Sequence, residues 1–205
     1  LRQSFETLVE HQRGIWKRER KPDDPPGGHW ETASQPRLWF DTLVDEKKTI
    51  DTVEFCLHEN TLGISRQLLC APDAALLAMF MLCSPVCDHG PAKWHRDLHP
   101  VDQAPLRGLQ ADMLENAPGL VQWNIPLYDD DVLWVVPGSH RRLNTDAENR
   151  QLQADPKVPL PNAIPVELNA GDGVVYTNTI LHWGSNYSAK PRRTIHMGYR
   201  GFGGP

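Results

Sequence analysis

The sequence has no long hydrophobic run, because the longest, residues 74–83, falls well short of the roughly 18 apolar residues of a membrane-spanning helix. It also lacks a basic excess: 21 Lys and Arg are set against 26 Asp and Glu, and the net charge is −5. Broad nucleic-acid binding usually goes with the opposite balance. No signal peptide is recognisable at the start. We therefore expect a protein that neither spans a membrane nor binds nucleic acid.

Cysteine is scarce as well, with only four residues, Cys56, Cys70, Cys83 and Cys87. None of them forms the Cys-x-x-Cys pair that is typical of structural zinc sites. Cys83 and Cys87 lie on either side of Pro85, so they are not expected to share a helical face. Reduced cysteines acting as small hydrophobic residues predict a cytoplasmic protein.

The 205 residues, of which 40% are hydrophobic, are enough for one domain with a substantial core. Residues 1–73 are predicted to be largely helical. One amphipathic helix is expected over residues 5–20, and a mostly helical stretch, interrupted at Gly63, over residues 38–69. Between them, a segment rich in Pro and Gly predicts a loop.

Residues 74–83 are ambiguous, because their composition favours a helix whereas their shortness and unbroken apolarity favour a buried strand. From Trp94 onward the segments become short, β-rich and bounded by turns. Strands are predicted over residues 120–127, 132–136, 163–168, 174–179 and 194–199. Several short strands at close spacing favour a sandwich or a barrel. We therefore expect helices first, then a mainly β core over residues 74–205 that holds the chemistry.

The segment Trp94-His95-Arg96-Asp97 contains the first candidate site. Side chains alternate between the two faces of an extended strand, so His95 and Asp97 are predicted to point the same way and Arg96 the other. An imidazole and a carboxylate on one face supply two of the three ligands of a 2-His-1-carboxylate iron site. Because His-x-Asp alone is a weak signal, the prediction depends on a second histidine, for which His182 is the candidate.

The order of the motifs is more specific than any one of them. His-x-Asp is followed by IPLYDDD at 125–131, VVPGSH at 135–140, a Gly-Asp turn at 171–172, His182, and PRRT at 191–194. In this order, over residues 74–202, the chain resembles the phytanoyl-CoA dioxygenase family of iron(II)- and 2-oxoglutarate-dependent oxygenases. The resemblance implies a double-stranded β-helix, a jelly-roll barrel. It also implies that His95, Asp97 and His182 bind iron(II), and that an arginine on the last barrel strand binds the distal carboxylate of 2-oxoglutarate.

Two adjacent arginines compete for that role. The family pattern of an arginine with a small or hydroxylated residue two positions later fits Arg192 with Thr194, and period-two alternation then places Arg193 on the packed outer face. The spacing from His182 keeps Arg193 as an alternative. Asn124, on a predicted barrel strand, is a further candidate for binding the cosubstrate.

Arg96, His99 and Trp183 are candidates for contacting the substrate because they lie next to the proposed ligands. Residues 129–131 are interpreted as an exposed acidic turn. His196 shares the face of Arg192 and is interpreted as a core histidine.

The resemblance implies a mononuclear non-haem iron dioxygenase that uses O2 to oxidise an unactivated C–H bond of a small molecule, with succinate and CO2 as co-products. Hydroxylation is favoured over halogenation, because halogenating relatives carry a small residue at the position of Asp97. The alternative is a cupin-like metal protein without oxygenase activity, or a catalytically silent binding module. The substrate and the oligomeric state are not indicated by the sequence.

Overall fold

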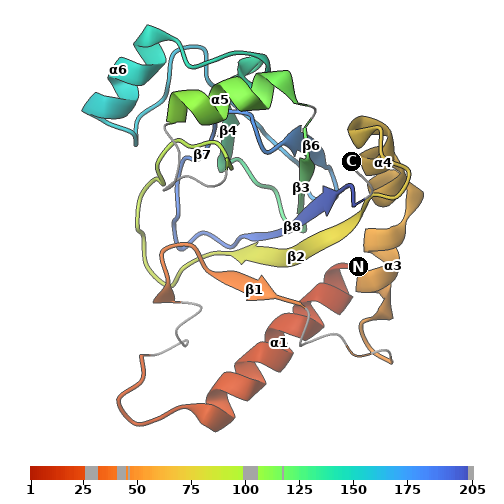
Figure 1. Ribbon diagram of the computed structural model, residues 1–205. Helices are drawn as coiled ribbons and strands as arrows, with labels where there is room; N and C mark the ends of the chain where they lie inside the picture. The colour runs from red at the N-terminus through yellow and green to blue at the C-terminus, as the bar shows by residue number, and fades with distance from the viewer. Residues whose placement is uncertain (26–31, 41–44, 46, 99–105, 117, 203–205) are drawn as a thin grey trace.

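A computed structural model describes residues 1–25, 32–40, 45, 47–98, 106–116 and 118–202. Two antiparallel sheets form the centre of the molecule (Figure 1). The larger sheet has the order β1-β2-β8-β3-β6, from Arg37–Trp39, Ala75–Cys83, Arg193–Arg200, Leu120–Pro126 and Val174–Thr177. The smaller has the order β5-β4-β7, from Ile164–Pro165, Leu133–Val135 and His182–Gly184.

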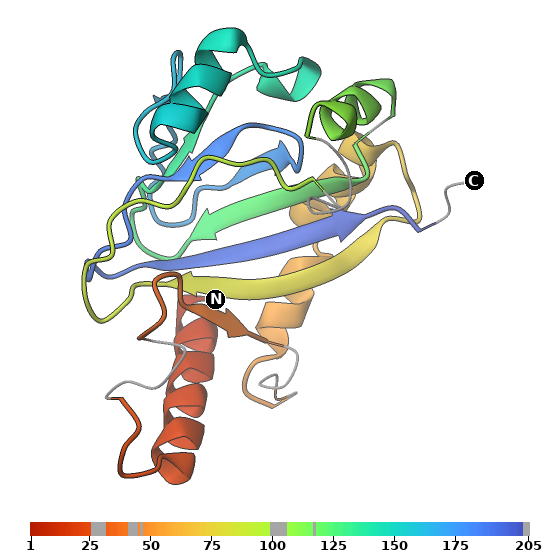
Figure 2. The same cartoon turned by 60° about the vertical axis from the view of Figure 1, so that its left-hand side comes forward.

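Helices cover this β centre on two opposite sides (Figure 2). On one side lie the helices α1 (Arg2–Glu19), α3 (Ile50–Leu57) and α4 (Ile64–Leu69), with a short π-helical turn, Glu59–Gly63, between the last two. On the other side lie α5 (Leu106–Glu115) and α6 (Asp146–Ala154). None of the helices in the described ranges combines the length and the apolarity that crossing a membrane requires.

The side chains of β8 point alternately to a packed face and to a polar face of the larger sheet. Ile195, Met197 and Tyr199 are fully buried against the helices, whereas Thr194 and His196 point to the opposite face. The neighbouring strand β3 repeats the pattern in register, with Trp123 opposite Met197. Period-two alternation thus gives the larger sheet one hydrophobic face, which packs against the helices, and one polar face.

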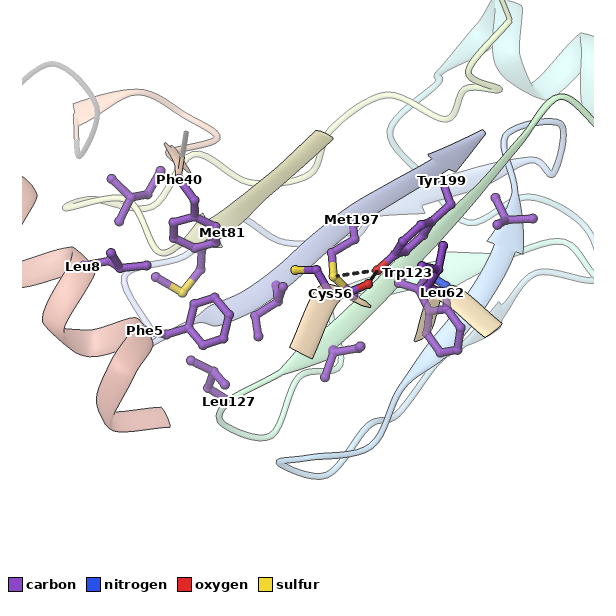
Figure 3. Packing of buried hydrophobic residues seen from close by; sticks show 14 of the residues in the cluster. Phe5, Leu8, Phe40, Cys56, Leu62, Met81, Trp123, Leu127, Met197 and Tyr199 are labelled. Carbon is purple, nitrogen blue, oxygen red and sulfur yellow. Dashed lines mark hydrogen bonds between the residues drawn. The ribbon is translucent and has the colours of Figure 1, made fainter. Parts of the chain in front are cut away.

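The hydrophobic core lies between this packed face and the first helices, and Figure 3 shows the side chains that meet there. Phe5 of α1 is fully buried and its ring lies 5.2 Å from that of Phe40. The hydroxyl of Tyr199 donates to the carbonyl of Cys56 at 2.6 Å, which joins β8 to the end of α3. Each large apolar side chain buried here contributes about 1.5–3 kcal/mol.

Several sequence predictions are confirmed. The helix expected over residues 5–20 is α1, and strands occur in each of the five predicted β segments. The ambiguous residues 74–83 form the strand β2, which pairs with both β1 and β8. Its apolar run is not explained by burial on both faces, because Met81 and Cys83 are buried whereas Leu77 is 49% exposed.

Other predictions are wrong or incomplete. The stretch 38–69 does not begin as a helix, because Arg37–Trp39 pair with β2 as an edge strand. Of residues 163–168, only Ile164–Pro165 form a strand. The helices α5 and α6 were not predicted, although α6 begins with a capping box in which Thr145 and Glu148 exchange side chain–backbone hydrogen bonds.

Candidate metal centre

The polar face of the large sheet and the strand β7 of the small sheet enclose a cavity of about 300 Å³. Its wall includes His95, Asp97 and His182 together with Arg192 and His196. These residues come from three separate parts of the chain. The fold therefore brings the predicted metal ligands and one of the two candidate arginines to a single cavity.

Backbone pairing places the two histidines opposite each other. The amide of His95 donates to the carbonyl of His182 at 3.1 Å, and the amide of His182 donates back at 3.0 Å. Their ring centroids are 4.2 Å apart. Asp97 lies on the same face, with carboxylate oxygens 3.7 Å from Nε2 of His95 and 3.4 Å from Nε2 of His182. One ligand atom from each residue lies within 4.8 Å of the other two.

Both imidazoles are oriented by their second nitrogen. Nδ1 of His95 is 2.8 Å from the carbonyl of Lys93, and Nδ1 of His182 is 3.0 Å from that of Ile180. A carbonyl only accepts hydrogen bonds, so Nδ1 carries the proton and Nε2 keeps a lone pair directed toward Asp97. Burial also lowers the pKa of His182 to about 4, so this histidine is neutral at neutral pH. Neutral imidazoles with free Nε2 atoms are the form that binds a metal.

Asp97 is held in its charged form. Burial alone would raise the pKa of its carboxyl, but His182, a hydrogen bond from Gln122 and His95 together outweigh burial and lower the pKa below its usual value. Nε2 of Gln122 donates to Oδ2 of Asp97 at 2.9 Å. The site thus presents two imidazole nitrogens and one carboxylate, the donor set of a facial 2-His-1-carboxylate iron site.

Arg192 lines the same cavity, and its side chain is held in place by Asp130. Its Nε donates to Oδ2 of Asp130 at 2.8 Å, and the hydroxyl of Thr194 donates to the same oxygen. The side chains of Arg192 and Asp130 are only 10% and 4% exposed. Burial alone would raise the pKa of Asp130, but Arg192 and Thr194 overcome this effect and lower it. Because the bond uses the Nε–H, the end of the guanidinium that carries both Nη groups can face another carboxylate.

Comparison with known proteins agrees with this arrangement. Residues 16–194, which are most of the chain, match the phytanoyl-CoA dioxygenase (PhyH) family. The chain belongs to the phytanoyl-CoA dioxygenase family. Members of this family are oxygenases that depend on iron and 2-oxoglutarate. A search of curated proteins gave no match.

Solved structures share the fold of this family member over nearly its whole length. AviO1 from Streptomyces viridochromogenes Tue57 is 23% identical with a TM-score of 0.60, over 98% of this chain and 85% of that one. EctD from S. alaskensis with bound Fe is 12% identical with a TM-score of 0.60, over 98% and 68%. The epimerase SnoN in complex with Fe³⁺, alpha ketoglutarate and nogalamycin RO is 18% identical with a TM-score of 0.57, over 97% and 74%.

The other predicted site residues of this phytanoyl-CoA dioxygenase family member lie in different places. Arg193 points to the packed side of the sheet, with Nε 3.6 Å from Oε1 of Glu6. Arg96 points away from His95 and Asp97, is buried, and donates to the carbonyl of Ser139 at 2.8 Å. The alternation predicted for the His95 segment is therefore confirmed.

Trp183 is buried beside the cavity and stacks on Trp94, with centroids 5.2 Å apart. Asn124 lines the cavity, and its Oδ1 is 2.7 Å from Nδ1 of His196. His196 is therefore part of the cavity wall as well as a packed residue. His99 lies outside the described residues.

The sequence analysis missed several residues of the site. It interpreted residues 129–131 as an exposed acidic turn, which is wrong for the buried Asp130. Tyr176, Asn178 and Tyr187 also line the cavity, and no motif in the sequence marked them. The hydrogen bond from Gln122 to Asp97 was likewise not predicted.

The lowered pKa of His196 predicts that the stability of the fold depends on pH. Burial lowers its pKa from 6.5 to about 4, and nearby Asp97 offsets burial only in part. Between these two values the unfolded chain binds more protons than the folded protein, so stability falls as the pH falls from 6.5 to 4. For one such group the slope is at most about 1.4 kcal/mol per pH unit.

The measurement is urea unfolding of the metal-free protein at several pH values, for the wild type and for His196→Phe. Phenylalanine keeps a flat ring against Phe80, whose centroid is 4.8 Å from that of His196, but it cannot bind a proton. The variant should lose stability less steeply over this window. Curves that run parallel for the two proteins would show that His196 stays accessible to protons in the folded state.

Proposed function

We propose that this protein is an iron(II)- and 2-oxoglutarate-dependent dioxygenase that oxidises an unactivated C–H bond of a small molecule, releasing succinate and CO2. The observation that carries the proposal is the presence of the His95, Asp97 and His182 ligand atoms and of Arg192 in one cavity. A metal centre alone suits many reactions, but an arginine facing it suits a dicarboxylate cosubstrate.

In this proposal His95, Asp97 and His182 would hold iron(II). Iron(II) held there would supply the activation of O2, and the electrons that O2 accepts would come from the oxidative decarboxylation of 2-oxoglutarate to succinate and CO2 and from the oxidised C–H bond of the substrate. Arg192, fixed by Asp130, binds the distal carboxylate of the cosubstrate. Gln122 orients Asp97 through its hydrogen bond to Oδ2.

We further propose that the two sheets are the two halves of a double-stranded β-helix and that residues 1–205 form one domain. The buried side chains of α1, α3 and α4 belong to the same hydrophobic cluster as those of β2, β3 and β8, which supports a single folding unit. Residues 1–73 would then form the helical layer that packs on the barrel together with the edge strand β1, and residues 74–205 the rest of the barrel.

The test is turnover of 2-oxoglutarate by the iron-loaded protein in air. We expect succinate to form slowly without substrate and faster when a correct substrate is present, and the product to gain oxygen. Because Asp97 supplies a carboxylate ligand, added chloride should not appear in the product, as mass spectrometry would show. If 2-oxoglutarate binds but is never converted, the protein is a silent binding module, and a chlorinated main product would contradict the role of Asp97.

A further inference from the structure

The charged side chains around the metal cavity are almost all basic. Among the described residues that line it, Arg37 and Arg192 face a single acid, Asp97. A second hollow adjoins this cavity and contributes Lys93 and Lys157 but no acid; the residues common to the two are Gln35, His95 and Tyr187. Because the chain has 26 acidic and only 21 basic residues, this local excess of positive charge runs against its composition.

Three of these cations have no counterion of their own. Within the described part of the chain, no carboxylate lies within ion-pair distance of Arg37, Lys93 or Lys157, and we call these three residues the basic rim. Arg192, in contrast, is paired with Asp130 at 2.8 Å. All three side chains of the basic rim are exposed, so a ligand can reach them.

Arg37 points to the cavity side of the larger sheet from its edge strand β1. The next residue, Leu38, is buried in the core, and alternation along the strand turns Arg37 to the opposite face. Its guanidinium carbon lies 5.1 Å from the ring centroid of Phe80, which belongs to the cavity wall. Burial raises the pKa of the Tyr187 phenol, and the charges of Arg192 and Arg37 offset part of that rise. The permanent charge of Arg37 thus acts on the cavity wall.

A backbone contact brings the two lysines of the basic rim to one hollow. The amide of Trp94, which follows Lys93, donates to the carbonyl of Pro156, which precedes Lys157, at 2.9 Å. The nearby acid Asp155 does not line the hollow, and its carboxylate accepts a hydrogen bond from the backbone amide of Lys157 at 2.8 Å. The two ammonium groups therefore add positive charge that no acid of the hollow cancels.

The proposed cosubstrate does not account for the basic rim. Arg192 and the metal would take the two carboxylates of 2-oxoglutarate, which leaves Arg37 and the lysines without an anionic partner. A cleft lined by charge of one sign raises the local concentration of ligands of the opposite sign. Arginine and lysine also form strong, charge-assisted hydrogen bonds with anionic oxygens.

We propose that the substrate is an organic anion and that Arg37 binds its charged group, while Lys93 and Lys157 extend the attractive field along the adjoining hollow. This inference rests on the proposed function of the same site and names the class of substrate. It sets an acid or an ester of an inorganic acid apart from a neutral small molecule of the same size.

The test uses protein loaded with Mn(II) and saturating 2-oxoglutarate, since manganese serves as a paramagnetic probe in place of iron. The two probes are 4-methylbenzenesulfonate and methyl 4-tolyl sulfone, in which a methyl group replaces the charged oxygen. A sulfonate is a poor metal ligand, so its binding reports on the protein. Relaxation of the probe protons by Mn(II) gives a dissociation constant. At low ionic strength we expect the sulfonate to bind at least about tenfold more tightly than the sulfone, and salt should reduce the difference.

The Arg37→Gln variant should reduce this preference to about threefold or less, because glutamine keeps a polar side chain but no charge. The matched control is Arg2→Gln, which removes the same charge from an exposed arginine that lies over the ring of Tyr128 and does not line the cavity. It should keep the full preference. The double variant Lys93→Gln/Lys157→Gln should weaken both the preference and its dependence on salt, and it replaces Arg37→Gln if that variant does not fold.

Equal binding of the two probes, no binding of the sulfonate, or a preference that survives in both rim variants overturns the inference. An equal loss in Arg2→Gln does so as well, because it would trace the preference to the net charge of the protein. Binding of 2-oxoglutarate to the Mn(II) protein is measured first. If the cosubstrate does not bind near the metal, the proposed function fails; if it binds and the charge of the probe makes no difference, only the inference about the substrate fails.

Discussion

Replacing His182 by alanine is expected to lower iron affinity and iron-dependent 2-oxoglutarate turnover by more than about 100-fold while the protein stays folded. Loss of residues that merely support metal ligands typically costs 10–100-fold, so the loss of a ligand should cost more. His182 is 6% exposed, and its Nε2 lies 3.4 Å from Asp97. Iron binding is measured by anaerobic titration, turnover by succinate formation, and folding by circular dichroism.

The control is His11→Ala. It removes an exposed histidine of α1 that does not line the cavity. It should leave iron binding and turnover unchanged. His95→Ala should behave like His182→Ala, because both Nε2 atoms face the same carboxylate. Stoichiometric iron and full turnover in either ligand variant would refute the assignment of the triad.

Replacing Arg192 by alanine should raise the dissociation constant of 2-oxoglutarate by about 10–100-fold, because charge-assisted hydrogen bonds contribute about 1.5–3 kcal/mol. The variant also leaves the buried Asp130 without its counterion, which is destabilising in itself. The thermal midpoint must therefore be recorded along with the titration. Arg192→Lys separates the two effects, since lysine can still neutralise Asp130 but lacks the planar fork that binds a carboxylate through two N–H groups.

Arg193→Ala is the matched control at the adjacent residue, the first of β8. Its side chain faces the packed side of the sheet near Glu6, and so it should change cosubstrate affinity by no more than about twofold. Weaker cosubstrate binding in Arg193→Ala than in Arg192→Ala would reverse the assignment. Intermediate affinity in Arg192→Lys, at a thermal midpoint near that of the wild type, would support the geometric role of the guanidinium.

The side-chain placements that the sequence predicted correctly depend on local periodicity. His95 and Asp97 are two residues apart, as are Arg192 and Thr194, and an extended backbone places such pairs on one face whatever the rest of the chain does. The same rule assigned Arg193 to the packed side, next to Ile195 and Met197. Residues 74–83 could not be assigned this way, because their apolar side chains show no alternation with polar ones.

The parts that the sequence did not predict depend on distant contacts. Asp130 is buried because Arg192, 62 residues later, pairs with it, and a run of three aspartates gives no sign of which one that is. Gln122 and Asn178 are linked to the site by their hydrogen bonds to Asp97, which lies 25 and 81 residues away from them in the sequence. The edge strand Arg37–Trp39 exists because β2 offers a free side for pairing, and no pattern within three residues encodes that partner.

The mutual backbone bonds between His95 and His182, with each Nδ1 bound to a carbonyl two residues before it, mean that the ligands are positioned without help from the ion. A preformed donor set of two imidazoles and a carboxylate follows the general affinity order of divalent metals, in which cobalt, nickel, copper and zinc all bind more tightly than iron(II). Selectivity for iron would then come from the supply of metal in the cell rather than from the site. The protein should exchange its ion without unfolding, so displacement by zinc would be a reversible inhibition, undone by chelation and iron.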